Sequence, residues 1–391
     1  MKTAAIIAEY NPFHNGHAHM IAKLRQAAPG AAILAIMSGD FTQRGEAAVI
    51  GKYARARAAV RCGCDLVLEL PAPWCFSGAE FFARGGTAIA HRLGCVDTLA
   101  FGAECADTTA LTLAAERMRT PEFAAALEAE RRTRLDANAA KLRADVYAHL
   151  YGDAMLFSGS NNLLALEYLQ SLQEMGSEIR PYAVKRLGGE FNDTALAGVC
   201  SATAIRAAMA GGKPVAEFLP AASAEILAEE AAAGRIYSMA RLDTAAAMAL
   251  RTADAKRLAG IMEISGGMEH RLIRAAREHR TIEAIVAACE ERRYSKSRLR
   301  RAILSAMLGV TMDMAEEYPR FTVLLAANAR GREVLGRARK SAQIAIISKS
   351  AQLKALDDAA RRQWAVHSAA MAVAELACAA EPELRQAYME E

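Results

Sequence analysis

The 391-residue chain has no uninterrupted apolar run of about 18 residues, the length that a membrane-spanning helix needs, so we expect no membrane partner. None of its eight cysteines forms a C-x-x-C pair, which favours reduced thiols over a disulfide framework or a metal site. A signal-peptide pattern is also missing at the N-terminus, and we therefore expect a cytoplasmic protein. The net charge of +4 is small, so it is compatible with a nucleic-acid partner without indicating one.

The chain does contain enough apolar material for a large core, since 53% of its residues are hydrophobic. Short apolar runs alternate with amphipathic stretches such as His17–Ala28 and Lys52–Arg61. This alternation predicts an α/β fold, namely a doubly wound, Rossmann-like sheet with helices on both faces. The predicted strands are Thr3–Ala8, Ala31–Ser38, Asp65–Leu70, Val96–Phe101 and Ile179–Val184.

The sequence predicts two domains. Residues 1–212 form the α/β domain, and residues 106–150 are a helical insertion within it, a hairpin or a lid, because they are rich in Ala, Glu and Arg. The boundary lies at Pro214 to Pro220. Residues 213–391 show helical patterns without a further convincing set of strands, so we expect an all-helical C-terminal domain.

The stretch AEYNPFHNGHAHM follows the first predicted strand. Asn11-Pro12 is a turn dipeptide, and Gly16 allows a ligand to approach the backbone. A helix is expected to begin near His17, where free N–H groups suit phosphate, and His14 can point the same way. The pattern predicts a clamp for a pentacoordinate phosphorus. A zinc site and turn histidines without function are the alternatives.

A second candidate phosphate motif, SATAIR, spans Ser201 to Arg206. Ser201 and Thr203 can cap the start of a helix, and Arg206 lies in the second turn, where it can reach phosphate oxygens. The alternative is an ordinary capped helix. The chain has no sequence with Walker A spacing, so a P-loop ATPase is not expected.

H-x-G-H after a first strand, followed later by S-x-T-x-I-R, resembles the α/β nucleotidyltransferase superfamily, in which two histidines hold the phosphates of ATP. A longer series of motifs resembles the bacterial tRNA(Met) cytidine acetate ligase family. This resemblance covers most of residues 1–212 and is looser beyond them. The motifs are AEYNPFHNGH, MSGDFTQRGEAA, KYARARAAVRCGCDLVLELP, VDTLAFGAE, SNNLLALEYLQSL, VKRLGG and CSATAIR, followed by RRYSKSRLRRAIL and ANARGREVL in the C-terminal half.

The resemblance implies a ligase that converts acetate and ATP into acetyl-AMP and pyrophosphate, and then acetylates N4 of the wobble cytidine of elongator tRNA(Met). It implies that His14 and His17 are the catalytic phosphate ligands. Mg²⁺ is compatible with the triphosphate, although the sequence identifies no metal ligand. The expected ATP-binding residues are Ile7, Ala8, Glu9, Tyr10, Asn11, Pro12, Phe13, His14, Asn15, Gly16, His17, Gly102, Asn162, Arg186, Ser201, Thr203 and Arg206.

Several positions depart from the family pattern. Ser160 and Ala165 stand where the family usually has Pro and Gly around its Asn-Asn pair. Phe191-Asn192 stands where the family has Tyr-His, and Asp40 replaces the commoner Asn. The departures leave the ATP motifs intact, and they mark where the preferred acid or the tRNA target of this chain can differ.

The basic segment from Glu269 to Arg301 holds ten Lys and Arg against five Glu, a stronger local balance than that of the whole chain. A basic helical face with an interleaved aromatic suits a tRNA backbone and an unstacked loop base. The alternative is a solvated charged face. The residues that we expect to bind tRNA are Arg292, Arg293, Tyr294, Lys296, Arg298 and Arg301.

Two other functions use parts of the same pattern. A small-molecule nucleotidyltransferase or acyl ligase of cofactor biosynthesis needs both phosphate motifs but not the basic helical half. A catalytically silent RNA-binding protein needs the basic half but not the intact His14, His17, Ser201 and Arg206. ATP-dependent release of pyrophosphate with acetate, and its response to tRNA, distinguish the three.

Overall fold

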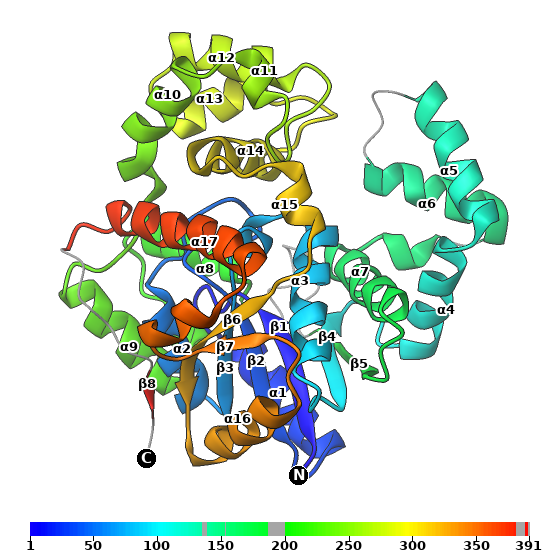
Figure 1. Ribbon diagram of the computed structural model, residues 1–391, viewed down its shortest axis with the longest axis vertical. Coiled ribbons are helices and arrows are strands. Elements are labelled where there is room, and N and C mark those ends of the chain that lie inside the picture. The colour runs from blue at the N-terminus through cyan, green and yellow to red at the C-terminus, as the bar shows by residue number, and fades with distance from the viewer. Residues whose placement is uncertain (135–138, 153, 187–199, 381–387, 390–391) are drawn as a thin grey trace.

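A computed structural model of the chain describes residues 1–134, 139–152, 154–186, 200–380 and 388–389 (Figure 1). Its centre is an eight-stranded sheet in the order β5-β4-β1-β2-β3-β6-β7, with β8 paired to β6. The strands are β1 (Thr3–Ala8), β2 (Ala32–Ser38), β3 (Leu66–Leu70), β4 (Thr98–Ala103), β5 (Arg180–Lys185), β6 (Phe321–Ala327), β7 (Ala345–Ile347) and β8 (Tyr388–Met389).

The first five strands run parallel and coincide closely with the predicted ones. β1 lies between β2 and β4, so the chain winds outward through β2 and β3 and then, on the other side, through β4 and β5. This is a doubly wound sheet, and the predicted α/β fold is confirmed. Such sheets bind ligands at the carboxyl ends of the strands where the winding reverses, here between β1 and β4.

Alternate side chains of the strands enter two separate cores. Ala5 and Ile7 of β1 belong to the core that also contains α3 (Ala79–Arg92), α7 (Ser160–Glu174) and α16 (Ala329–Ser341). Ala4 and Ile6 belong to the core that contains α1 (Asn15–Ala27) and α2 (Lys52–Arg61). Because successive side chains of a strand point to opposite faces, each short apolar run becomes a strand buried on both sides.

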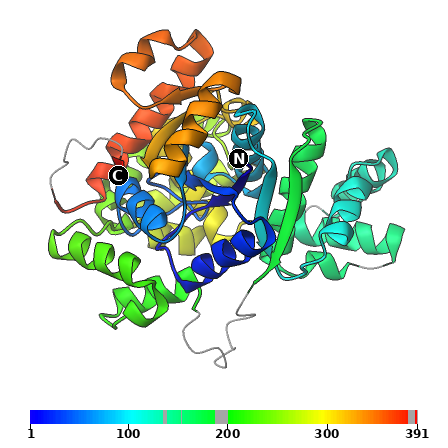
Figure 2. The same cartoon turned by 90° about the horizontal axis from the view of Figure 1, so that it is seen from below.

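The predicted insertion is helical, as expected, and consists of α4 (Thr108–Met118), α5 (Pro121–Thr133) and α6 (Ala139–Tyr151). Thr120 starts α5 because its hydroxyl accepts the Phe123 N–H at 3.3 Å and Pro121 occupies the first helical position. Two views show α5 and α6 standing off one side of the sheet (Figures 1 and 2). A role as a lid stays a prediction.

Most of the chain beyond residue 200 is helical, and α10 to α14 form the upper end of the molecule in Figure 1. Among the residues that the structure describes, no helix is long and apolar enough to cross a membrane. Besides α16, the helices of this part are α8 (Ala202–Ala210), α9 (Ala221–Ala232), α10 (Asp243–Arg251), α11 (Ala255–Leu258), α12 (Met268–Glu278), α13 (Ile282–Cys289), α14 (Lys296–Leu308), α15 (Met312–Glu316) and α17 (Asp358–Leu376). Short 3₁₀ turns are η1 (Trp74–Phe76), η2 (Met155–Phe157), η3 (Ala216–Phe218), η4 (Met239–Leu242) and η5 (Ser350–Ala355).

The expectation that residues 213–391 are all-helical is wrong. β6 is fully buried, returns to the sheet and pairs antiparallel with β3, where the Thr322 hydroxyl donates to the Glu69 carbonyl at 2.7 Å. The run FTVLLAA is too short for its periodicity to separate a buried strand from a buried helix, and the sequence reading missed it for this reason. The division into two domains at residue 212 stays a prediction. The C-terminal part contributes β6 and β7 to the sheet of the N-terminal part.

Candidate active site

The HNGH turn joins β1 to α1 through two reciprocal histidine contacts. His14 is the N-cap residue of α1, and its Nδ1 accepts the Gly16 N–H at 3.1 Å. In return, Nδ1 of His17 accepts the His14 N–H at 3.1 Å. Two imidazoles thus form the capping box that Ser and Glu usually provide, and the helix begins at Asn15, two residues before its predicted start.

The capping box decides which protons the two imidazoles carry. Since Nδ1 of each ring accepts a backbone N–H, the proton of each neutral ring is on Nε2. Burial, followed by the charges of Arg186 and Arg206, lowers the pKa of His14 to about 4. Burial and then the neighbouring His14 lower the pKa of His17 well below 6.5. Both rings are therefore neutral at pH 7, and each keeps one Nε2–H to donate to an anion.

The residues that precede the two histidines anchor the turn in the protein core. Tyr10 and Phe13 are each 1% exposed, and their ring centroids are 4.8 Å apart in the core. The Asn11 side-chain oxygen accepts the Val49 N–H at 2.7 Å, and the Phe13 carbonyl accepts from the Ser223 hydroxyl at 2.7 Å. The side chains of Tyr10, Asn11 and Phe13, which we expected at the ATP, are therefore packed as supports of the clamp.

Arg55 ties the carboxyl ends of two strands together. Its guanidinium is fully buried and donates to the carbonyls of Glu9 at 2.7 Å and Ser38 at 3.1 Å, and also to that of Gly39. The sequence reading missed this residue. A charge within the otherwise Ala-rich inner face of KYARARAAVR is the pattern that indicates it.

Gly102 of β4 lies beside Arg186, the residue that directly follows β5. A Cβ at Gly102 would lie 3.1 Å from Cγ of Arg186 and 3.4 Å from Cε of Met20, so glycine lets these two side chains pack closely against β4. Nη1 of Arg186 donates to the side-chain oxygen of Asn161 at 3.0 Å. Arg186 therefore places a cation beside β4, one of the two strands between which the winding reverses and where such sheets bind ligands.

Glu104 connects β4 to the start of α7. Its carboxylate accepts the backbone N–H of Asn162 at 2.7 Å and the side-chain amide of Asn161 at 2.6 Å. Burial alone would raise the pKa of Glu104, but these hydrogen bonds lower it overall. Asn162, an expected ATP ligand, is 2% exposed and its side-chain oxygen accepts the Cys105 N–H at 3.0 Å. In this structure it therefore links α7 to β4.

The second phosphate motif lies beside the first. The Ser201 hydroxyl caps α8 by accepting the Ala204 N–H at 3.2 Å, as predicted, and Thr203 lies half-buried in the first turn. Nη1 of Arg206 donates to the Asn11 carbonyl at 2.9 Å, three residues before the HNGH turn in the same motif. The fold thus brings residues 195 positions apart in the sequence into direct contact.

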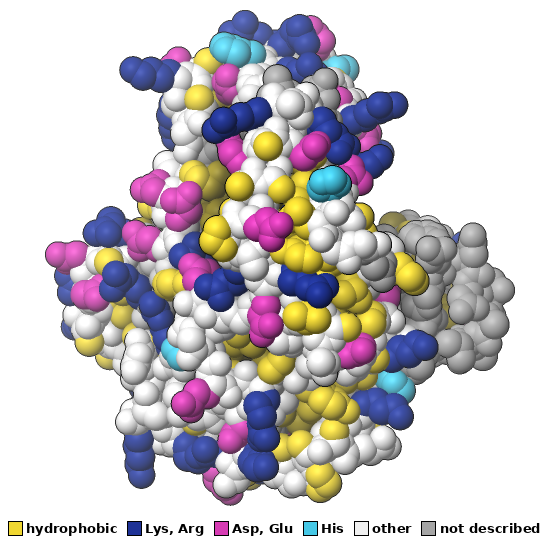
Figure 3. Space-filling view, turned by 90° about the vertical axis from the view of Figure 1, so that its right-hand side faces the viewer, with side chains coloured by type: hydrophobic (Ala, Val, Ile, Leu, Met, Phe, Trp, Pro, Cys, Tyr) yellow, Lys and Arg dark blue, Asp and Glu magenta, His cyan; other side chains and the backbone are white. Residues whose placement is uncertain are grey.

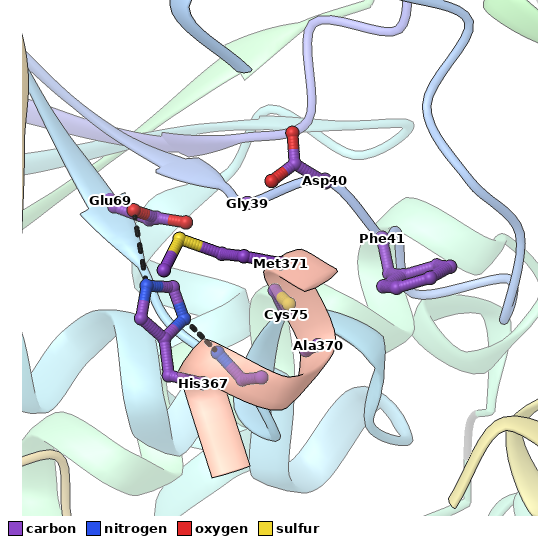
Figure 4. A pocket seen from close by; sticks show the side chains of 9 residues that line it. Gly39, Asp40, Phe41, Glu69, Cys75, His367, Ala370 and Met371 are labelled. Carbon is purple, nitrogen blue, oxygen red and sulfur yellow. Dashed lines mark hydrogen bonds and ion pairs between the residues drawn. The ribbon is translucent and has the colours of Figure 1, made fainter. Parts of the chain in front are cut away.

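A buried cluster of charges lies beneath the carboxyl ends of β2 and β3 (Figure 4). Nζ of Lys52 lies 2.8 Å from Oε1 of Glu69 and 3.7 Å from Oδ2 of Asp40. Nε2 of His367, from α17, lies 3.6 Å from Oε2 of Glu69. The cavity here is about 10 Å³, room for one water, so we interpret the cluster as a support for the site rather than a ligand pocket.

Asp40, the departure in the SGDF motif, belongs to this support. Its Oδ1 accepts the Lys52 N–H at 3.1 Å at the start of α2. The other departures have different positions: Ala165 is fully buried in α7, Ser160 begins that helix, and Phe191 and Asn192 lie outside the described residues. Within the described part of the chain, no group of three or more His, Cys, Asp or Glu side chains could hold a metal ion.

The expected stacking of a base on Tyr294 is wrong. The ring is 0% exposed, and its hydroxyl donates to the carbonyls of Ser265 at 2.9 Å and Gly266 at 2.7 Å. The guanidinium carbons of Arg293 and Arg298 lie 4.6 and 5.3 Å from the ring centroid. Tyr294 is therefore a core residue of the helical part, and a base cannot reach its face.

Several of the expected RNA-binding arginines have partners within the protein. Arg301 pairs with Glu263 at 2.7 and 3.2 Å, and Arg298 donates to the Ser265 hydroxyl at 2.7 Å. Arg293 donates to the Gly266 carbonyl at 2.7 Å. Arg292 and Lys296 are exposed. Of the predicted RNA ligands, these two have the exposure that a phosphate contact requires.

Comparison with known protein families supports a phosphate-binding role for this site. A model of the family described as HIGH Nucleotidyl Transferase matches residues 1–387. The doubly wound sheet and the paired histidines, together with this match, define a nucleotidyltransferase of the HIGH class.

Individual relatives narrow the class. The tRNA(Met) cytidine acetate ligase of Syntrophotalea carbinolica is 34% identical over 362 residues, which cover 90% of this chain and 86% of the relative. That of Acetivibrio thermocellus is 31% identical over 382 residues, or 93% and 92% of the two chains. The crystal structure of Thermotoga maritima TmcAL bound with alpha-thio ATP matches with a TM-score of 0.91 and 27% identity, and 100% of both chains is covered. This chain belongs to the tRNA(Met) cytidine acetate ligase family, which confirms the resemblance seen in its motifs.

Proposed function

We propose that the chain is an ATP-dependent ligase that activates acetate as acetyl-AMP and acetylates N4 of the wobble cytidine of elongator tRNA(Met). The observation that carries the proposal is the contact of Arg206 with the Asn11 carbonyl, because it joins the two phosphate motifs at the carboxyl edge of the sheet. The names of the relatives support the same substrates, and the bound alpha-thio ATP of the Thermotoga maritima protein supports ATP. Because tRNA and ATP are its substrates, we propose that the protein acts in the cytoplasm.

In the first step, an acetate oxygen forms a bond to the α-phosphorus while the bond to pyrophosphate breaks. The Nε2–H groups of His14 and His17 donate to the phosphate oxygens, on which charge grows in the transition state. Both rings are neutral before substrate binds, so they act as fixed donors rather than as acids. Arg186 and Arg206, whose charges both act on His14, supply positive charge near the phosphates. Mg²⁺ is compatible with this step as a companion of the triphosphate.

In the second step, N4 of cytidine attacks the acetyl carbon, AMP leaves with the bonding electrons, and N4 loses a proton. An exocyclic amine of cytosine is a poor nucleophile, so it needs an activated acyl donor held close to it. The wobble base already lies in a loop, and presenting it costs less than extruding a base from a duplex. A mixed acyl-phosphate anhydride meets the first need and a tRNA anticodon loop meets the second.

We propose that RNA lies across the exposed basic face around α12. Arg274 and Arg277 of α12 line a hollow of about 550 Å³ next to α11. Arg292 and Lys296, from the predicted set, are exposed on the same helical part. Lys and Arg side chains gather at the upper end of Figure 3, the end that α11 and α12 form in Figure 1. Asp254 and Glu278 also line the hollow, so the proposal rests on the exposed arginines and lysine around it, which suit an RNA backbone without requiring an exposed aromatic.

The test of this proposal follows an isotope label from acetate to the tRNA. The purified chain, ATP and isotope-labelled acetate should place label on one cytidine of elongator tRNA(Met), read by mass spectrometry of the digested RNA. A tRNA with uridine at the wobble position is the matched control and should stay unlabelled, and labelled acetyl-CoA without ATP should transfer nothing. Transfer of AMP to a small molecule instead of acetyl to RNA would favour the cofactor-biosynthesis alternative.

A further inference from the structure

The loop between β2 and α2 contacts both the phosphate site and helix α14. Phe41 and Ala47 pair at its base, and the Thr42 N–H donates to the Glu46 carbonyl at 2.9 Å, which closes a tight turn. Gly45 at its tip has a φ of +72°, and a Cβ there would lie only 2.5 Å from the backbone nitrogen of Arg301. The tip therefore packs directly on the backbone of α14, and a side chain would separate the two.

Gln43 and Glu46 of this loop each contact one residue at the phosphate site and one residue of α14. The Gln43 N–H donates to Oε1 of Glu9, before the HNGH turn, at 2.8 Å, while its carbonyl accepts from Arg301 at 3.0 Å. Glu46 lies between two arginines: Oε1 is 3.0 Å from Nη1 of Arg300, and Oε2 is 3.8 Å from Nη2 of Arg206. One carboxylate is thus shared between the second phosphate motif and α14.

We propose that Glu46 is a positioning residue that couples the phosphate site to helix α14 through its two arginine partners. The inference rests on the proposed function only in taking Arg206 to be a phosphate ligand. A carboxylate near Arg206 competes with the nucleotide phosphates for the same guanidinium. Arg300 reduces this competition, because it holds the carboxylate at the closer of the two distances. Any change that breaks the ion pair between Arg300 and Glu46 leaves the Glu46 carboxylate to pair with Arg206, and this weakens nucleotide binding.

The coupling is reciprocal by thermodynamic necessity. If the state of Arg300 changes the affinity for nucleotide, then nucleotide changes the freedom of Arg300 by the same factor. Arg300 also pairs with Glu283 at 2.7 and 2.8 Å, so α13 and α14 share one cation with the loop. The loop thereby offers a route by which occupation of the basic helical part changes the ATP site.

The test measures binding of a non-hydrolysable ATP analogue to the full-length chain by calorimetry, without acetate or RNA. Arg300→Ala should weaken binding about fivefold, a coupling at the lower end of the usual range, because Glu46 is left to Arg206 alone. Glu46→Gln should bind at least as tightly as the parent, and adding Arg300→Ala to Glu46→Gln should have no further effect. Arg361→Ala is the matched control, since Arg361 is an exposed arginine of α17 with its own partner, Asp358, at 3.5 Å.

Unchanged binding by Arg300→Ala, or a weakening that persists in the double variant, overturns the coupling through Glu46. Circular dichroism of each variant reports its folding. Because the assay contains no acetyl acceptor, it can succeed while acetylation fails, or fail while acetylation succeeds. The coupling and the proposed ligase activity are therefore tested separately.

Discussion

The imidazole rings of His14 and His17 stack with centroids 3.7 Å apart and planes inclined by 26°. Each Nδ1 is occupied by a backbone N–H of the same turn, so both Nε2–H groups remain for a ligand. Two cations at this distance would repel each other, and burial keeps both rings neutral. The site therefore has two oriented donors before any substrate arrives, and this arrangement leads to the first prediction.

Replacing His17 by Ala should reduce acetyl-AMP formation about a hundredfold, as expected for the loss of one preorganised donor to a developing charge. The measurement is acetate-dependent exchange of pyrophosphate into ATP. His19→Ala is the matched control, because His19 lies two residues further along the same helix and should leave the exchange rate near that of the parent. Near-parent exchange by the His17 variant would remove it from the phosphate clamp.

The stability of the chain should fall as the pH falls from 6.5 toward 4. Burial depresses the pKa of His14 to about 4, so between these values the unfolded chain takes up a proton at this residue and the folded chain does not. The contribution of His14 to the free energy of unfolding is fully present above pH 6.5 and is lost as the pH falls to about 4. For a pKa shift of this size the loss amounts to about 3 kcal/mol. Urea unfolding at several pH values measures it, and a shallower slope is expected for His14→Gln. An equally steep slope in that variant would contradict the assignment to His14.

Tyr294→Phe should keep the parent affinity for tRNA and lose about 1 kcal/mol of unfolding free energy, the usual net contribution of one hydrogen bond. Tyr294→Ala should lose about 3–5 kcal/mol, because it opens a cavity in the core of the helical part. Urea unfolding and filter binding measure the two quantities. A loss of RNA affinity in the Phe variant at unchanged stability would instead indicate that the hydroxyl touches RNA.

Reversing the charge of Arg274 and Arg277 to Glu should weaken tRNA binding and reduce its dependence on salt, since fewer counterions are released. Acetyl-AMP formation without tRNA should continue, because α12 is remote from the two phosphate motifs in the fold. Reversing both Arg131 and Arg132 to Glu, two exposed arginines of α5, serves as the charge-matched control. Loss of both activities together would show that the face is needed for folding rather than for RNA.

Lys52→Met should destabilise the chain by about 3–5 kcal/mol, because it leaves the buried Glu69 carboxylate without its cation. Adding Glu69→Gln should recover much of that loss, since the remaining group is then neutral. Urea unfolding of the two variants beside the parent measures both effects. If the double variant is no more stable than Lys52→Met, the cost comes from lost packing rather than from an unpaired charge.

The local pattern of the chain was sufficient to predict the first five strands and the HNGH turn. Short apolar runs buried on both faces are typical of parallel strands, and the order of the motifs indicated the family. The same reading missed β6, because a run of seven mostly apolar residues is compatible with a strand or a helix until a partner strand is known. It also placed Tyr294 on a surface, because charged neighbours in sequence do not reveal that a ring points inward.

By itself, the sequence determined the residue types that chemistry requires: two histidines around a glycine, a capped helix with an arginine, and a basic C-terminal half. Only the tertiary structure decided how these residues are used. Arg206 meets Asn11 across 195 positions, Arg301 is neutralised by Glu263, and Glu46 is shared between Arg206 and Arg300. Such pairings depend on which surfaces the sheet and helices bring within a few ångströms, and no spacing along the chain encodes that distance. Exposure decides between an RNA ligand and an internal ion pair, and exposure is a property of the packed molecule.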